Sequence, residues 1–309
     1  MMSSSLSNSL PNHVFAVAAQ AGTLGTCTRN CNPLYDLAFP QIGQTLTSAG
    51  ISWAYYQYNW PDSLDCTGPY TSSTAFPSST LLDTKWTGLA DFTQVQTTPI
   101  ECSSLLNYND LQTAIQTNSL PNVTWVIPSP SVSEHPAQGT WTDGQLYVSS
   151  IINSIEASPA WLSTAIFLMW DDWGGFYDHI VPTQIDPAGE GFRVPLIAIS
   201  PYSISGGIVQ GPSYTANGKH TTQEDFSSLL STIESSWNLP SLGQRDSYEP
   251  PLWTCSTLHK RLYLPCTWRA QVWSIRCPVA RLPVLTWPPR RYCMSRIPTS
   301  PHLTTTLNH

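Results

Sequence analysis

The chain has 309 residues, 41% of them hydrophobic and only 11% charged, and its 20 acidic and 13 basic residues give a formal net charge of −7. That length is sufficient for one large domain with a sizeable core. No apolar run reaches about 18 residues, which excludes a transmembrane helix, and the negative charge gives no electrostatic reason to expect a nucleic-acid partner. The oligomeric state is left open.

Helices and strands alternate in the first third of the chain. Residues 13–19 form an apolar run that fits a buried strand or the start of a helix, since periodicity does not separate the two. Residues 39–49 predict a helix closed by Gly50, and residues 51–58 predict a strand rich in aromatic residues. Residues 60–105 are turn-rich and predict a long inserted loop.

The alternation continues through the rest of the body. Capping boxes at Thr142 with Gln145 and at Thr221 with Glu224 predict the starts of two helices, the second covering residues 221–236. The remaining predicted elements are a short helix over 110–116 and strands over 123–127, 164–170 and 194–199. Alternating helices and buried strands predict an α/β fold with a mostly parallel central sheet and helices on both faces.

The charge divides the chain into two parts near residue 250. Residues 1–249 hold all 20 acidic and five basic residues, a net charge of −15, whereas residues 250–309 hold eight basic residues and no acidic one. We therefore expect a main domain over 1–249 and a poorly ordered tail over 250–309. Four cysteines lie in each part, and those of the body, Cys27, Cys31, Cys66 and Cys102, predict one or two disulfides in an exported protein.

Polar residues follow several predicted strands. Asp171 and Asp172 come directly after the strand 164–170, where α/β proteins gather their ligands, and two carboxylates suit a hard divalent cation or acid–base chemistry. His135 follows the strand 123–127, and His220 precedes the predicted helix 221–236, where an imidazole could contact an anion. With His179 close to the aspartates, this set predicts a metal-assisted hydrolase.

Residues 170–179, WDDWGGFYDH, resemble the W-D-D-x-G-G-F-Y-D-H signature of the bacterial phosphoesterase family, which includes non-specific phospholipases C and a group of acid phosphatases. SEHP at 133–136, GFRVP at 191–195, SPY at 200–202, and His220 with the segment after it resemble further motifs of that family in the same order. The resemblance covers roughly residues 9–249 and implies an alkaline-phosphatase-like fold.

The same resemblance implies the roles of the site residues. Ser9, two residues before Pro11-Asn12, corresponds to the family's nucleophile, although the residues alone predict a disordered serine-rich terminus. Asp171 and Asp172 would hold a divalent metal of unknown identity, and His135 and His220 would bind phosphate oxygens or protonate the leaving group. The implied substrate is a phospholipid or another phosphate ester, and the implied location of an intact member is extracellular or periplasmic.

The sequence departs from the family at both ends. The E-N-x-S-F-D metal motif expected before the nucleophile is absent, as is a signal peptide, so we expect a chain truncated at its start, and the resemblance stops near Trp253. Two alternatives stay open. One is a glycoside hydrolase that pairs Asp171 with Glu134 or Glu190, and the other is an inert fragment of a phosphoesterase.

Overall fold

The computed structural model describes residues 1–26, 36–58, 60, 66, 86–203, 214–216, 219–221 and 224–252, with only the backbone described for 214–216 and 219–221. The α-helices are α1 (Ser9–Ala18), α2 (Ile42–Ser48), α3 (Thr93–Thr97), α4 (Pro99–Cys102), α5 (Asp110–Gln116), α6 (Trp141–Glu156) and α7 (Ser227–Trp237). The strands are β1 (Trp53–Gln57), β2 (Leu105–Asn107), β3 (Val123–Ile127), β4 (Ile166–Met169), β5 (Leu196–Ile199), β6 (Tyr214–Ala216) and β7 (Lys219–Thr221). Short 3-10 turns are η1 (Gly22–Thr26), η3 (Gly88–Asp91), η4 (Pro130–Val132), η5 (Trp161–Ser163) and η6 (Arg245–Ser247).

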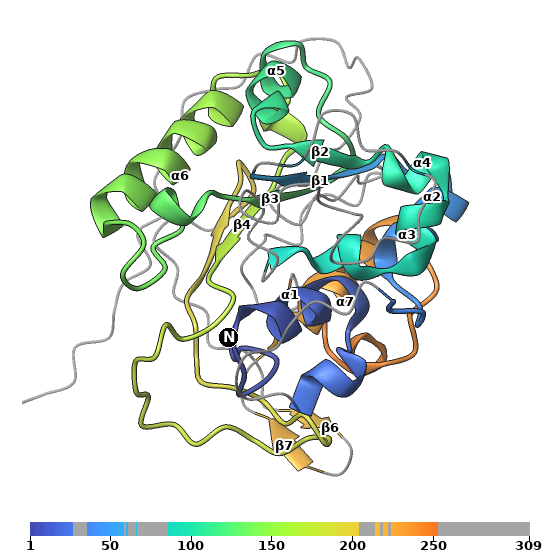
Figure 1. Cartoon of the computed structure of the whole chain (residues 1–309), viewed down its shortest axis with the longest axis vertical. Helices are drawn as coiled ribbons and strands as arrows, with labels where there is room; N and C mark the ends of the chain where they lie inside the picture. The colour runs from blue at the N-terminus through green and yellow to red at the C-terminus, as the bar shows by residue number, and fades with distance from the viewer. Residues whose placement is uncertain are drawn as a thin grey trace, which may run out of the picture. The chain divides into compact units, whose positions relative to one another are not determined.

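The sheet that organises these elements is parallel, in the order β2-β1-β3. Alternate strand residues enter two separate apolar clusters, so the sheet is covered on both faces. One face packs against α1, α2, α7 and η3, and the other against α5 and α6 (Figure 1). The predicted α/β class and the helices on both faces are confirmed, and the aromatic residues of β1 are buried in this core.

Strand direction departs from the prediction at β4 and β5. These two strands pair antiparallel as a sheet of their own, with Ile166 opposite Ile199 and Met169 opposite Leu196. They match the strands predicted over 164–170 and 194–199 in place. Periodicity reports which residues are buried but carries no information on strand direction, so a mostly parallel sheet was only partly correct.

Both predicted capping boxes are wrong. The first turn of α6 is capped by Thr140, whose hydroxyl accepts the Asp143 amide hydrogen at 3.1 Å, so the helix begins one residue before Thr142. The last helix, α7, begins at Ser227 rather than Thr221, because Lys219–Thr221 pairs with Tyr214–Ala216 as a short antiparallel hairpin. A Thr-x-x-Glu pattern does not exclude a strand, and here the strand pairing prevails.

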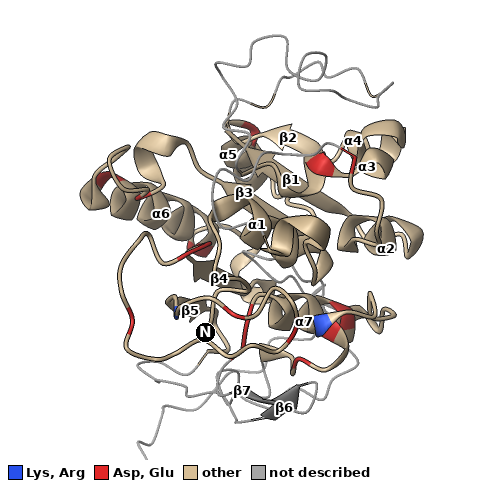
Figure 2. Cartoon of the chain, turned by 60° about the horizontal axis from the view of Figure 1, so that its bottom comes forward, with Lys and Arg blue, Asp and Glu red and all other residues tan. Residues whose placement is uncertain are grey.

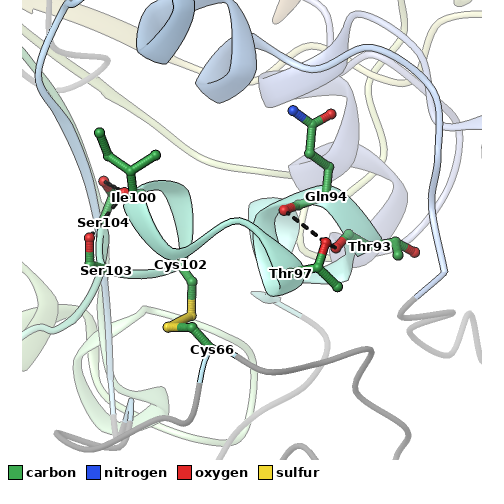
Figure 3. The surroundings of a disulfide bond; sticks show 8 residues. All are labelled: Cys66, Thr93, Gln94, Thr97, Ile100, Cys102, Ser103 and Ser104. Atoms are coloured by element: carbon green, nitrogen blue, oxygen red, sulfur yellow. Dashed lines mark hydrogen bonds between the residues drawn. A yellow bond between two sulfur atoms is a disulfide. The ribbon is translucent and has the colours of Figure 1, made fainter.

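The region predicted as an inserted loop, 60–105, is partly helical. Its last third forms η3, α3 and α4, while residues 61–65 and 67–85 lie outside the described residues. Cys66 and Cys102, both within this region, form a disulfide at the end of α4 (Figure 3). One predicted body disulfide is thus confirmed. Cys27, Cys31 and residues 253–309 lie outside the described residues.

The first residues of the chain are built into the domain. Ser3, Ser4 and Ser5 are fully buried, and Met2 forms a β-bridge with Arg193. The Gly191 amide donates to the Ser3 carbonyl at 2.8 Å, and a Cβ on Gly191 would lie 2.3 Å from the Ser5 carbonyl oxygen. The disordered terminus that the serine-rich composition predicts is therefore wrong, because these serines satisfy their backbone groups within the domain.

Arg245 holds this N-terminal segment to the rest of the domain. Its side chain is 2% exposed, and its guanidinium donates to both Asp186 carboxylate oxygens at 2.7 and 2.8 Å and to Asp225 Oδ2 at 2.7 Å. It also donates to the carbonyls of Ser4 and Gly189, and it lies 4.4 Å above the Phe15 ring. All five guanidinium N–H groups are thus used.

Replacing Arg245 should destabilise the domain strongly. In Arg245→Met, the carboxylates of Asp186 and Asp225 lose their partner, and a broken buried ion pair costs about 3–5 kcal/mol. Urea unfolding followed by circular dichroism would measure this cost. The more exposed pair of Arg193 with Asp178 supplies the matched control, Arg193→Met, with an expected cost below about 1 kcal/mol.

An unchanged urea midpoint in Arg245→Met would contradict this role. If the variant fails to fold, the double variant Arg245→Met/Asp225→Asn should recover part of the stability, because it removes the charge that is left uncompensated.

Asp91 is a buried carboxyl group in η3. It is fully buried, its Oδ1 accepts the Thr87 hydroxyl at 2.9 Å, and its Oδ2 has no hydrogen-bond partner among the described residues. Burial raises the pKa of Asp91 to about 8. The folded state therefore retains a proton on Asp91 that the unfolded chain releases near pH 4.

Asp91 should make stability fall with rising pH. Because its folded pKa lies above the unfolded value, its contribution is complete below about pH 4 and is lost as the pH rises through 8. Asp91→Asn removes this titration, so the stability of the variant relative to wild type should increase between pH 5 and 8. Urea unfolding at several pH values checks this, and a pH-independent difference between the two proteins would contradict it.

Candidate active site

Ser9 is the first residue of α1. The helix begins there because Pro11 is tolerated in a first turn and because Leu10, Val14 and Phe15 bury one face in the core. The Ser9 hydroxyl donates to Asp172 Oδ2 at 3.4 Å. A serine predicted as the nucleophile thus lies at a helix N-terminus, in contact with one of the two predicted aspartates.

Asp171 and Asp172 follow the end of β4, as predicted. The turn after them is held by the Gly174 amide, which donates to Asp172 Oδ1 at 2.7 Å. Gly174 and Gly175 have φ angles of +62° and +81°, a conformation that glycine adopts without strain. The two glycines therefore let the chain turn sharply and leave the second oxygen of Asp172 directed at Ser9.

The two aspartates have opposite pKa shifts. Burial, together with the adjacent charge of Asp171, raises the pKa of Asp172 to about 6. Burial also acts to raise the pKa of Asp171, but the contacts with His13 and Ser9 outweigh it and lower that pKa. Asp171 is therefore the ionised member of the pair, and Asp172 can gain or lose a proton near neutral pH.

His13 is the site residue that the sequence analysis missed. It lies one turn after Ser9 on α1, and its Nε2 is 3.5 Å from Asp171 Oδ2. Ser9 and His13 are four positions apart, and residues at i and i+4 share a helix face. This spacing indicates that they lie together only if residues 9–18 are interpreted as a helix. The strand alternative for residues 13–19 is wrong, because the run is the second half of α1.

The aspartate pair fits part of a cation site. Asp171 Oδ2 is buried and has no hydrogen bond within the described residues; its contact is His13 Nε2 at 3.5 Å, so a cation bound there would compete with His13. Burial and the adjacent Asp171 raise the pKa of Asp172, and a cation bound beside it would oppose that shift. Oxygen donors of this kind suit Ca²⁺, Mg²⁺ or Mn²⁺. Within the described residues, no group of three His, Cys, Asp or Glu side chains gathers to complete a ligand set.

His135 lies on the loop after β3. Its ring is centred 6.2 Å from the Trp86 ring, and it is close enough for its charge to lower the pKa of Asp172 slightly. The neighbouring Glu134 accepts the Trp170 indole N–H at 3.1 Å, which connects this loop to the residue before the aspartates. His135 thus interacts electrostatically with Asp172, and its catalytic role stays a prediction.

The other predicted residues are His220, His179 and Glu190. His220 belongs to β7 instead of preceding a helix, and its side chain lies outside what the structure describes. His179 is exposed and contacts Asp178 at 3.4 Å. Glu190, the second possible glycosidase partner, is buried and accepts the Thr183 amide hydrogen at 3.2 Å.

A layered α/β domain with a helix N-terminus and paired carboxylates at a strand end has the arrangement of an α/β enzyme. The comparison with known proteins specifies which kind. Residues 1–240 match the Phosphoesterase family, and the chain belongs to that family. This membership favours a phosphate ester hydrolase over the glycoside hydrolase alternative.

The curated relatives carry phospholipase C names. The chain is 28% identical over 229 residues to phospholipase C B of Mycobacterium tuberculosis, covering 64% of this chain and 42% of the relative. It is 27% identical to a non-hemolytic phospholipase C of Burkholderia pseudomallei, covering 63% and 31%, and to non-specific phospholipase C4 of Arabidopsis thaliana, covering 77% and 43%. The chain thus spans less than half the length of these relatives.

Removing the His13 imidazole should change the charge state of the aspartate pair. In His13→Ala, Asp171 loses a contact that lowers its pKa, so that pKa should rise. A carboxyl-carbon NMR titration would measure the shift. His179→Ala, which removes an exposed imidazole bound to Asp178, is the control and should leave the titration unchanged. An unchanged Asp171 titration in His13→Ala would contradict the role of His13.

Proposed function

We propose that this chain hydrolyses phosphate esters through a serine nucleophile, in the manner of a phospholipase C. The observation that carries the proposal is the hydrogen bond from the Ser9 hydroxyl to Asp172 at 3.4 Å, at the start of α1. Membership of the Phosphoesterase family supports the reaction class. The proposal assigns Ser9 as the nucleophile.

In the first step, Ser9 Oγ attacks phosphorus and passes its proton to Asp172 Oδ2, its hydrogen-bond acceptor. Without a bound cation, the pKa of Asp172 is about 6, so the carboxylate is ionised at neutral pH and can accept this proton; a cation bound by the pair would lower that pKa. The bond between phosphorus and the leaving alcohol oxygen breaks as the serine–phosphorus bond forms. His135 donates a proton to that oxygen, which leaves as an alcohol.

The start of α1 suits the negative charge of the phosphate. Ser9 occupies its first position, the Asn8 side chain makes no capping hydrogen bond, and the helix has ten residues to build a dipole. The first backbone amides of α1 would therefore bind phosphate oxygens as Ser9 attacks. His220 is a second proposed phosphate ligand, on the basis of the family resemblance.

In the second step, water attacks the phosphoserine and its proton goes to His135. The serine–phosphorus bond breaks, and Ser9 recovers the proton held by Asp172. A divalent cation bound by Asp171 and Asp172 would supply charge neutralisation at the phosphate and a lower pKa for the serine hydroxyl. His13 keeps Asp171 ionised throughout both steps.

The substrate and setting are extensions of the same proposal. The phospholipase C names of the relatives favour a phospholipid over a phosphomonoester. We also propose the alkaline-phosphatase-like arrangement, an extracellular or periplasmic location, and a functional domain that ends near residue 249. Among the described residues, no helix is both long and apolar enough to span a membrane.

Ser9→Ala and Asp172→Ala should each lower kcat by roughly a thousandfold or more, because each removes a participant in the first step. The assay is hydrolysis of p-nitrophenylphosphorylcholine and p-nitrophenyl phosphate, with EDTA and with added Ca²⁺, Mg²⁺, Mn²⁺ or Zn²⁺. The matched control is Ser154→Ala, a partly exposed serine on α6, which should retain full activity. Circular dichroism confirms folding in each case.

Turnover that survives Ser9→Ala would overturn the nucleophile, and turnover that survives Asp172→Ala would overturn the base. No turnover by the folded wild-type chain under any metal condition would favour the inert fragment.

A further inference from the structure

The first half of the loop between β4 and β5 carries exposed apolar side chains. Phe176, Tyr177 and Val181 are 64%, 84% and 83% exposed, and we call these three residues the apolar tip. The loop leaves the sheet directly after Asp171 and Asp172 and runs outside the helical layers (the olive trace in Figure 1). Large apolar side chains that are exposed together usually mark an interaction surface.

The apolar tip is held in place by the surrounding structure. The rings of Trp173 and Tyr177 lie 5.5 and 5.9 Å from the Phe192 ring, in edge-to-face contacts. Asp178 accepts the Ile180 amide hydrogen at 3.2 Å, which closes a local turn. The aromatic residues are thus presented to solvent by a braced loop, and a partner need not order them on binding.

The apolar tip itself has no charged side chain. Asp178, which follows Tyr177, is paired with the Arg193 guanidinium, which donates to both carboxylate oxygens at 2.5 and 2.7 Å. Elsewhere the described chain is strongly acidic, as the preponderance of red over blue in Figure 2 shows. The apolar tip is therefore a neutral aromatic surface on an acidic domain.

We propose that the apolar tip docks the chain on a zwitterionic phospholipid surface, which presents the lipid headgroup to Ser9; the inference rests on the proposed function. Aromatic side chains prefer the boundary between headgroups and acyl chains, and a neutral patch enters it without desolvating a charge. The loop contains the signature aspartates and the tip within eleven residues, 171–181, so docking brings the bilayer to the site.

Binding to vesicles tests the docking without any catalytic step. The full chain is sedimented with phosphatidylcholine vesicles, with and without added phosphatidylserine, at low and high salt. We expect binding to pure phosphatidylcholine, little changed by salt. The double variant Phe176→Ser/Tyr177→Ser should bind at least ~10-fold more weakly, since two aromatic rings no longer leave water. Phe176→Trp/Tyr177→Trp should bind as well as wild type.

Leu162→Ser is the matched control. Leu162 is 62% exposed, as Phe176 is, but lies on η5 before β4, at the opposite end of that strand from the aspartates. Its loss should leave vesicle binding unchanged. Equal weakening by Leu162→Ser would overturn the proposal. So would binding that requires phosphatidylserine and survives the double variant, because the basic residues of 250–309 would then explain it.

Hydrolysis separates this proposal from the proposed function. The double variant should hydrolyse the soluble p-nitrophenylphosphorylcholine at the wild-type rate but phosphatidylcholine vesicles at least ~10-fold more slowly. Wild type could bind vesicles through the apolar tip and yet hydrolyse neither substrate. That result would overturn the proposed function and support the docking surface. Hydrolysis of both substrates by wild type, with no effect of the double variant, would support the proposed function and overturn the docking proposal.

Discussion

Arg245 is the interaction on which the rest of the described domain depends. Its buried guanidinium donates hydrogen bonds to two carboxylates and two carbonyls, and it packs on the ring of Phe15 in α1. The position of α1 in turn fixes Ser9 against Asp172. The geometry of the candidate site therefore depends on an ion-pair network to which none of the site residues belongs.

Much of the fold follows from the sequence because burial has a visible period. The helix over 110–116 and the strand over 123–127 were predicted with the bounds that the structure has. The errors arise where the pairing of one segment with another decides the structure. Thr221 forms part of a hairpin rather than a helix cap, and the antiparallel pairing of β4 with β5 depends on chain direction, which no local pattern encodes.

The candidate site was predictable to a similar extent. The family resemblance gave Ser9, Asp171 and Asp172 their roles, and the structure places the serine against one of these aspartates, while their chemistry stays a prediction. The resemblance did not assign a role to His13, whose contact with Asp171 depends on the helical spacing of α1. Nor did it indicate that the aspartates differ in pKa, since that difference comes from burial and neighbours.

The contacts of Arg245 also affect the order in which the domain folds. Arg245 contacts Ser4 across 241 positions of the chain, so the N-terminal segment acquires this partner only near the end of domain synthesis. Contacts of such high sequence separation form late and slow folding, because a long loop must close before they contribute. On the ribosome, Ser9 would therefore stay outside its final environment until residue 245 has left the exit tunnel. A nascent chain therefore completes the surroundings of Ser9 only when the whole domain is available.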